Sequence, residues 1–223
     1  MPLIRQSQRS CHSIPPSLGH MSTLETWLMT SPMTVITHLM SFFSVRRLHA
    51  IRRTSKSLRL IFDAYATVAW DLNLRLKPWF SDVAGFRRTL HETNGIISGS
   101  QALQFFDREH YSDSDMDIFM RAGGVETMCT WLTHHSYVYE EDYPVYPRGV
   151  MKEKLFTLSS RAIESTSNTN RPLLGVFNFV KRGRDVKKQE VFYHVQVIAV
   201  DIDPINYVLF EFHSSECLYT LFF

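Results

Sequence analysis

Hydrophobic and polar residues follow two different periods along the chain. In the N-terminal part, apolar residues recur every three or four positions, which is typical of amphipathic helices. Ser31-Pro32 predicts the start of one helix, with the serine as N-cap and the proline in the first turn. A longer helix is predicted from a stripe with basic residues beside it: Leu48, Ile51, Ser55, Leu58, Phe62 and Tyr65. A further helix, "VAGFRRTLHET", is predicted to end at Gly95.

Beyond Gly95 the pattern changes to strands and helices in alternation. "GIIS" and "DMDIFM" predict strands on either side of the helix "SQALQFFDRE". Gly123-Gly124 is predicted to interrupt the chain before the helix "VETMCTWLTHH", and "SYVYEEDYP" predicts another strand. Residues 159–171 are polar and predict a loop. "PLLGVFNFVK" and "QEVFYHVQVIAV" predict a β-hairpin, so the fold class expected is α+β with a mixed sheet and flanking helices.

These patterns divide the chain into three parts. Residues 1–20 carry Ser, Pro and Arg without an acidic residue and predict a disordered leader, because they cannot bury enough apolar surface to offset the entropy of ordering. Residues 21–93 are predicted to form a helical region, and residues 94–223 to form the α+β domain. The chain ends on an apolar run, "YVLFEFHSSECLYTLFF", which is consistent with a domain that is truncated at its C-terminus.

Composition narrows the class of protein. The chain has 223 residues, of which 44% are hydrophobic and 21% charged, values that are typical of a globular protein. No apolar run reaches the ~18 residues of a membrane-spanning helix, so no membrane partner is expected. Three widely spaced cysteines, Cys11, Cys129 and Cys217, fit neither a disulfide framework nor a zinc site. A reducing compartment, the cytoplasm or the nucleus, is therefore predicted.

Charge is distributed unevenly between the two halves. Residues 1–90 hold 12 Lys/Arg and 4 Asp/Glu, a balance of +8, whereas residues 91–223 have a balance of −6. The first half could attract an acidic partner, including nucleic acid, or the two halves could simply neutralise each other. The basic segment around residues 46–59 lacks interleaved aromatic residues that would stack on bases, so a solvated helix surface is the preferred interpretation.

One stretch, "IISGSQALQFFDREHYSDSDMDIFM", combines residues that suit a nucleotide and a metal ion. Gly99 allows the backbone to approach a ligand, and Ser100 offers a hydroxyl at the start of a helix, where free amides favour phosphate. Asp115 and Asp117 lie two positions apart on a strand, so both carboxylates face one side. Paired carboxylates opposite such a turn suit a divalent metal. An ordinary β-α-β corner with a solvated acidic edge remains the alternative.

Ile97-Ser98-Gly99-Ser100, followed after 14 residues by Asp115-Met116-Asp117-Ile118, resembles the signature of the nucleotidyltransferase (polymerase beta-like) superfamily. The wider stretch from about Leu48 to His213 is similar to uncharacterised fungal proteins in which an F-box-like helical segment precedes such a domain. Residues 32–72 would be that segment. The resemblance implies a nucleotidyltransferase fold, a nucleoside triphosphate, and an Skp1-like adaptor of a ubiquitin ligase as a partner.

The same resemblance implies roles for single residues. Gly99 and Ser100 would bind the triphosphate, and Asp115 and Asp117 would be the catalytic residues that hold Mg2+ while a hydroxyl attacks the α-phosphate. The superfamily also uses a third carboxylate on a later strand, where this chain has Gln196. Glutamine is neutral and cannot act as a base. Asp201 and Asp203 follow and could replace it as metal ligands only if the strand register shifts.

Other chemistry-bearing residues are assigned structural roles. His134 and His135 are predicted at a helix end, His194 and His213 in apolar strands, and Cys129 as a buried, inert thiol. Phe177, Phe179, Phe192 and Phe210 are predicted as core residues. Two hypotheses follow: a nucleotidyltransferase-fold protein that is weakly active or inactive, and a non-enzymatic F-box-type adaptor that recognises a partner.

Overall fold

A computed structural model describes residues 21–111, 114–140, 150–164, 172–184 and 189–211, with the side chains of 161–164 left out. The predicted leader, His213 and residues 212–223 of the C-terminal run lie outside the described residues, as do Cys11 and Cys217. The chain divides into two compact units, Met1–Tyr65 and Ala66–Phe223. Among the described residues, no helix combines the length and apolar character needed to cross a bilayer.

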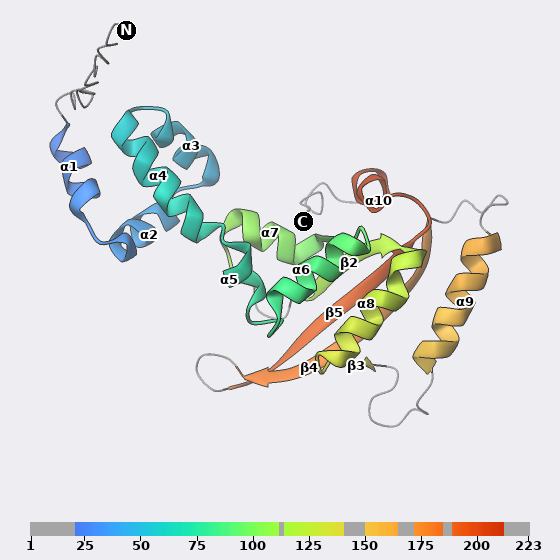
Figure 1. The fold of residues 1–223 in the computed structure, drawn as a ribbon. Coiled ribbons are helices and arrows are strands. Elements are labelled where there is room, and N and C mark those ends of the chain that lie inside the picture. Colours follow the sequence, from blue (N-terminus) through green and yellow to red (C-terminus); the bar gives the residue numbers. More distant parts are fainter. Residues whose placement is uncertain (1–20, 112–113, 141–149, 165–171, 185–188, 212–223) are drawn as a thin grey trace, which may run out of the picture. The chain divides into compact units, whose positions relative to one another are not determined.

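The first unit contains the helices α1 (Thr23–Thr30), α2 (Met33–Ser41), α3 (Val45–Arg52) and most of α4 (Lys56–Ala69) (Figure 1). Ser22 and Glu25 form a reciprocal capping box at the start of α1. α2 begins one residue later than predicted, with Pro32 as its N-cap and no side-chain capping bond from it. Of the predicted stripe, Leu48, Phe62 and Tyr65 are buried, whereas Ile51 and Leu58 are half-buried.

The single long helix predicted through that stripe is instead two helices. α3 ends at Arg52, and α4 begins at Lys56. The Ser55 hydroxyl accepts a hydrogen bond from the backbone N–H of Leu58 at 3.1 Å, which is the geometry of an N-cap. Serine at the junction thus starts a new helix, although the apolar period continues across it.

The second unit is an α+β fold around one mixed sheet, which confirms the predicted fold class. Two short helices, α5 (Leu72–Leu76) and α6 (Val83–Glu92), precede the sheet. The remaining elements are β1 (Ile96–Ser98), α7 (Gly99–Asp107), β2 (Met116–Arg121), α8 (Ala122–His134), β3 (Val138–Tyr139), α9 (Val150–Glu164), β4 (Leu173–Arg184), β5 (Glu190–Val200) and α10 (Pro204–Phe210). The strand order is β1-β2-β5-β4-β3. β2 and β5 run parallel, and the other neighbouring pairs are antiparallel, including the predicted β4–β5 hairpin.

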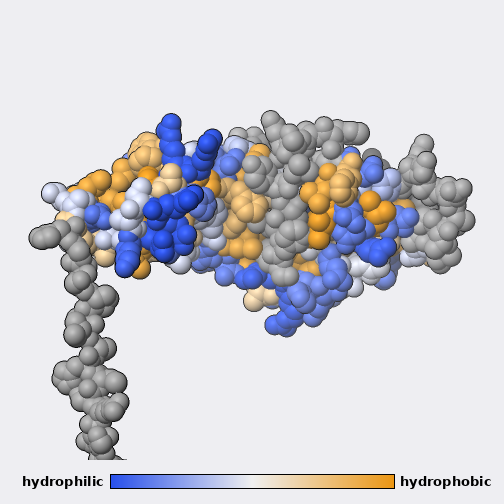
Figure 2. All heavy atoms as spheres, turned by 90° about the horizontal axis from the view of Figure 1, so that it is seen from above, coloured by the Kyte–Doolittle hydropathy of each residue, from blue (hydrophilic) through white to orange (hydrophobic). Residues whose placement is uncertain are grey.

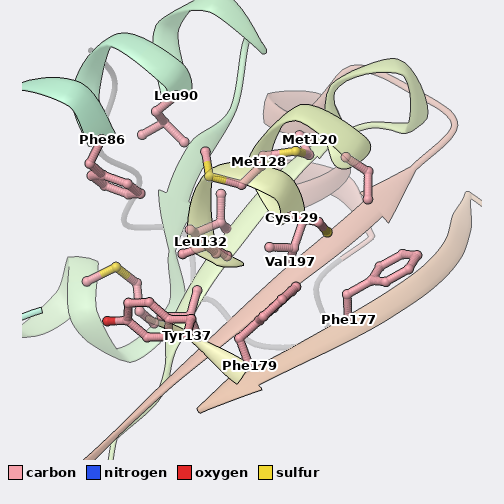
Figure 3. Close-up of a cluster of buried hydrophobic side chains, with 14 of the residues drawn as sticks. Phe86, Leu90, Met120, Met128, Cys129, Leu132, Tyr137, Phe177, Phe179 and Val197 are labelled. Atoms are coloured by element: carbon pink, nitrogen blue, oxygen red, sulfur yellow. The ribbon is translucent and has the colours of Figure 1, made fainter. Parts of the chain in front are cut away.

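Helices α6, α8 and α9 lie over one face of this sheet (Figure 1). Side chains from α6, α8, β4 and β5 converge there into the main core, with Phe86, Leu90, Met128, Leu132 and Val197 fully buried (Figure 3). The opposite face is covered at one end, where Val208 of α10 packs against Ile96, Phe119 and Ile198. The main core therefore occupies one face of the sheet, and the start of β2 and the middle of β5 also carry side chains on the second face.

Three predictions for this unit need correction. Gly123 and Gly124 lie inside the first turn of α8 instead of before it. Glycine at position 124 is required by packing, because a Cβ there would collide with Thr93 at the end of α6. Residues 159–164 are helical in α9, although a loop was predicted there. Phe192 and Phe210 are exposed, whereas Phe177 and Phe179 are buried as predicted.

Candidate functional site

The predicted strand–turn–helix–strand motif is present, and its strands are neighbours. β1 and β2 pair antiparallel, with Ser98 opposite Asp117. In the parallel β2–β5 ladder Asp117 is opposite Gln196, and in the β4–β5 ladder Gln196 is opposite Asn178. A row of four polar residues therefore crosses four strands. Strand side chains alternate between faces, and the neighbours Ile118, Val197 and Phe177 lie in the main core. The polar row consequently faces the side of the sheet opposite the main core, where Ser98 is fully buried and Asp117 and Gln196 are half-buried.

Gly99 fits the turn between β1 and α7 for two reasons. Its φ angle is +71°, in the left-handed region that residues with a Cβ rarely adopt. A Cβ at this position would also collide with Oδ2 of Asp117. The backbone of the turn thus lies directly against the Asp117 carboxylate. The N-cap residue Ser98 makes no side-chain capping bond to the first turn of α7.

Ser100 and Gln196 connect this turn to the second aspartate. The Ser100 hydroxyl donates to the backbone carbonyl of Asp115 at 3.2 Å. The Gln196 amide Nε2 donates to Oδ2 of Asp115 at 3.3 Å. Asp115 precedes the first residue of β2, so the strand starts one residue later than predicted. All four residues predicted at the site, together with Gln196, are brought together.

The carboxylates of Asp115 and Asp117 lie close enough for their negative charges to repel each other, and Asp117 is also desolvated. Burial, and after it the negative charge of Asp115, raise the pKa of Asp117 from 3.8 to about 7. Such a shift indicates a desolvated carboxylate beside a like charge. In the described part of the chain, no group of three or more His, Cys, Asp or Glu side chains could hold a metal ion.

Asp201 and Asp203 are not brought to this site. Because Asp117 is opposite Gln196 in the ladder, Asp201 lies five residues further along the chain, roughly 17 Å at ~3.3 Å per residue. Its backbone carbonyl accepts from the Arg121 guanidinium. The Asp203 carboxylate accepts from the amides of Ile205 and Asn206 as the N-cap of α10. Neither residue can replace Gln196 without moving β5.

A polar network that the sequence analysis missed supports the segment before β2. Gln101 and Gln104 are 5% and 0% exposed, and the amides of both donate to the Ser114 hydroxyl, at 2.7 and 2.6 Å. Arg75 donates to the carbonyl oxygens of both glutamines, at 3.2 and 2.7 Å. Ser114 precedes Asp115, so this network fixes the backbone from which that carboxylate extends.

Beside Asp115, but not lined by Asp117, lies a groove of about 1570 Å³. Asp115, Ser114 and the two glutamines line it on one side, and Phe192, Tyr193 and His194 of β5 line it on another. His194 is not the core histidine that was predicted, because its side chain is 44% exposed and its Nδ1 lies 2.8 Å from Oε1 of Glu140. The polar alternation of His194 and Gln196 in "FYHVQVIAV" was a signal for this edge. No local sequence pattern indicated Glu140, which lies 54 positions before His194.

The remaining predicted candidates behave as structural residues. Cys129 is fully buried, and burial raises the pKa of its thiol to about 12, so it is inert as predicted. His134 and His135 lie at the C-terminal end of α8, where the His135 ring stacks on Trp131. Comparison of the chain with protein-family models, with curated proteins and with solved structures finds no match in any of the three.

Proposed function

We propose that the chain is a nucleotidyltransferase-fold protein of the polymerase beta-like type, which binds a magnesium–nucleoside triphosphate and transfers the nucleoside monophosphate slowly or not at all. The observation that carries this proposal is the position of Gly99. A glycine turn at the start of a helix lies against the half-buried Asp117 of β2, and a second aspartate, Asp115, lies two residues earlier, directly before that strand. A solvated acidic edge would require neither the close approach nor the desolvation of Asp117.

The residues present suit one divalent cation. Asp115 and Asp117 supply carboxylate oxygens, the ligands that Mg2+ prefers. The raised pKa of Asp117 adds to this argument, because a bound cation would remove the repulsion from Asp115 and part of the cost of burial. Bound magnesium would neutralise charge on the phosphates and polarise the α-phosphoryl group. Gly99 and the first turn of α7 would contact the triphosphate through backbone amides, and Ser100 would hold the Asp115 backbone in place.

Gln196 is the reason why we expect transfer of the nucleoside monophosphate to be slow. It occupies the position beside Asp117 where the resembled superfamily has its third carboxylate, but it is neutral and donates its amide to Asp115. Two carboxylates offset only part of the charge of two divalent ions, so a second ion would be bound weakly. A glutamine also cannot accept the proton of an attacking hydroxyl. We therefore assign the site to nucleotide binding first and to transfer second.

The first experiment measures binding of ATP to the purified chain with and without magnesium. Asp115→Asn is expected to weaken magnesium-dependent binding at least tenfold, because a removed carboxylate ligand is not replaced. Glu126→Gln is the matched control, since Glu126 is an exposed acid of α8, the helix that packs on the main-core face of the sheet. Equal affinities of Asp115→Asn and Glu126→Gln for magnesium–ATP would refute the proposal.

A second candidate function concerns the first unit alone. Seven large apolar side chains of the helices α1, α2 and α4 and the α2–α3 turn are exposed: Leu24, Trp27, Met29, Met33, Val35, Phe42 and Leu60. In Figure 2 hydrophobic and hydrophilic surface lie side by side on this part of the chain. Exposed apolar residues of this number are typical of a protein interface. This observation favours the F-box-type alternative, in which the helices dock an Skp1-like adaptor.

Charge specifies what such an adaptor would present. The two acidic residues of the described first unit are used internally. Glu25 accepts from the Ser55 hydroxyl, which with Ser22 lowers its pKa from 4.5 to about 2, and Asp63 pairs with Arg52 at 2.8 Å. The exposed cations are Arg46, Arg47, Arg53, Lys56 and Arg59. The partner would have to offer an apolar groove with acidic residues around it.

A pull-down of an Skp1-type adaptor by the intact chain tests this second function. Phe42 is 70% exposed, so Phe42→Asp is expected to leave the fold intact and to reduce adaptor capture at least tenfold. Leu209→Asp is the control, because Leu209 is also exposed but belongs to α10 of the second unit. Absence of capture by the unmodified chain would remove the adaptor function and leave the nucleotide proposal untouched.

A further inference from the structure

His194 and Glu140 form an oriented acid–base pair at the edge of the candidate site. Nδ1 of His194 lies 2.8 Å from Oε1 of Glu140, and the side chains are 44% and 37% exposed. With the carboxylate as acceptor, Nδ1 carries the single ring proton of the neutral imidazole, and in that form Nε2 holds the free lone pair. Nε2 makes no hydrogen bond to the described residues. A carboxylate that fixes the tautomer of an imidazole is the arrangement that prepares histidine to accept a proton.

The sheet places this imidazole next to Asp115. In the parallel ladder Met116 is opposite Val195 and Asp117 is opposite Gln196. One step back along the same register, His194 precedes Val195 as Asp115 precedes Met116. His194 also lies on the same face as Gln196, because the two are two positions apart on β5. Asp115 and His194 both line the groove, so a molecule in the groove can contact both.

The surroundings of His194 differ from those of an ordinary surface ion pair. Across the β4–β5 ladder its partner is Val180, which brings no competing charge. Of the two cations that directly follow Val180 on β4, Lys181 lies over the Tyr137 ring and donates to the Trp79 carbonyl, and Arg182 is paired with Glu190. The groove beside the ring is large enough for a hydroxyl-bearing molecule, and Phe192 and Tyr193 supply apolar surface next to it. The imidazole therefore faces a space in which a hydroxyl group can approach Nε2.

We infer that His194, oriented by Glu140, is the general base that activates the acceptor hydroxyl in place of the missing third carboxylate; this inference rests on the function proposed above. Neutral Nε2 takes the proton of the hydroxyl as its oxygen forms a bond to the α-phosphorus. The bond between the α-phosphorus and the oxygen bridging to the β-phosphate breaks, and pyrophosphate leaves with that electron pair. The resulting imidazolium is stabilised by Glu140 and returns its proton to water. The acceptor class is a hydroxyl compound that enters the groove on the β5 side.

The test uses the full-length chain with magnesium–ATP and glycerol as a soluble hydroxyl acceptor, and it measures pyrophosphate release and ATP affinity separately. His194→Ala is expected to lower the release rate about 100-fold and to leave the affinity for magnesium–ATP within about twofold. Glu140→Gln, which removes the orienting charge, is expected to lower the rate about tenfold. His91→Ala is the control, because His91 is an exposed histidine of α6 that does not line the groove.

Chemical rescue supplies a readout that a purely structural role of His194 would not change. Added imidazole is expected to restore part of the rate of His194→Ala and to leave the rate of His91→Ala unchanged. NMR of the ring nitrogens supplies a readout independent of activity: His194 should be the Nδ1-protonated tautomer in the unmodified chain and a mixture of tautomers in Glu140→Gln.

The inference is overturned if His194→Ala and His91→Ala release pyrophosphate at equal rates, if imidazole restores nothing, or if the unmodified chain releases none. These results are distinguishable from failure of the proposed function. When Asp115→Asn weakens magnesium–ATP binding but His194→Ala leaves pyrophosphate release unaffected, the nucleotide site stands and only the role of His194 is refuted. When Asp115→Asn binds magnesium–ATP normally, both proposals fall.

Discussion

Asp117→Asn is expected to make the protein more stable than the unmodified chain near pH 8, and about equally stable below about pH 4. The pKa of Asp117 is raised from 3.8 to about 7 in the folded protein, so the folded state holds this proton more tightly than the unfolded chain does. Below the unfolded pKa the carboxyl is neutral in both states and adds no penalty. As the pH rises through the folded pKa, a desolvated charge forms beside Asp115, which costs on the order of 4 kcal/mol. Asparagine has no such charge.

Urea unfolding of both proteins at about pH 5 and about pH 8 measures this difference. The stability gap should widen between the two pH values, because the carboxyl is mostly protonated in the folded state at the lower one. Glu126→Gln, which removes an exposed charge from α8, should show a small and pH-independent offset. Magnesium should stabilise the unmodified chain more than Asp117→Asn. A gap that stays constant from pH 5 to 8 would contradict the electrostatic account of this site.

The parts of the fold that could be predicted from sequence are those whose signals are local. The strand–turn–helix–strand motif follows from an apolar run, a glycine that adopts a positive φ and alternation on the next strand. The β4–β5 hairpin follows in the same way, because each strand alternates over more than ten residues. The class of the fold follows from these elements together.

The errors have a common physical origin in tertiary contacts. Residues 159–164 carry few apolar side chains, and α9 is held through residues nearer its start, such as Leu158, which is buried in the main core. Gly124 is tolerated in α8 because only a residue without Cβ allows Thr93 to approach so closely. Neither contact can be inferred from local sequence. Residue propensities alone therefore predicted a loop at residues 159–164 and an interruption of the chain at Gly123-Gly124.

The candidate site also contains some residues whose meeting could be predicted from local sequence and others whose meeting could not. Gly99, Ser100, Asp115 and Asp117 are near one another in sequence, and their meeting could be predicted. Whether Gln196 reaches the site depends on the register between β2 and β5, and the structure pairs Gln196 with Asp117. The pairing of Glu140 with His194 joins residues 54 positions apart, which no local pattern could reveal. The His194–Glu140 pair, to which we assign a role in proton transfer, is therefore formed by a long-range contact.

Gln196→Asp is expected to increase magnesium-dependent nucleotide binding and to raise pyrophosphate release above that of the unmodified chain. The substitution removes an amide that donates to Asp115 at 3.3 Å and adds a third carboxylate opposite Asp117. Without a cation, three neighbouring carboxylates repel one another, so the variant should be less stable than the unmodified chain at neutral pH. With magnesium the third ligand should tighten ATP binding about tenfold or more. Isothermal calorimetry at several magnesium concentrations measures this gain.

Asn178→Asp is the matched control for this gain, because it adds the same charge to the same polar row but one strand further from Asp117. Neighbouring strands lie ~4.8 Å apart, so the new carboxylate would lie roughly 10 Å from Asp117 at the backbone and too far to share a cation with it. Asn178→Asp should therefore bind magnesium–ATP as the unmodified chain does. A gain that is equal in both variants would mean that negative charge on this face attracts magnesium without a built site, and the assignment of Gln196 to the third ligand position would be wrong.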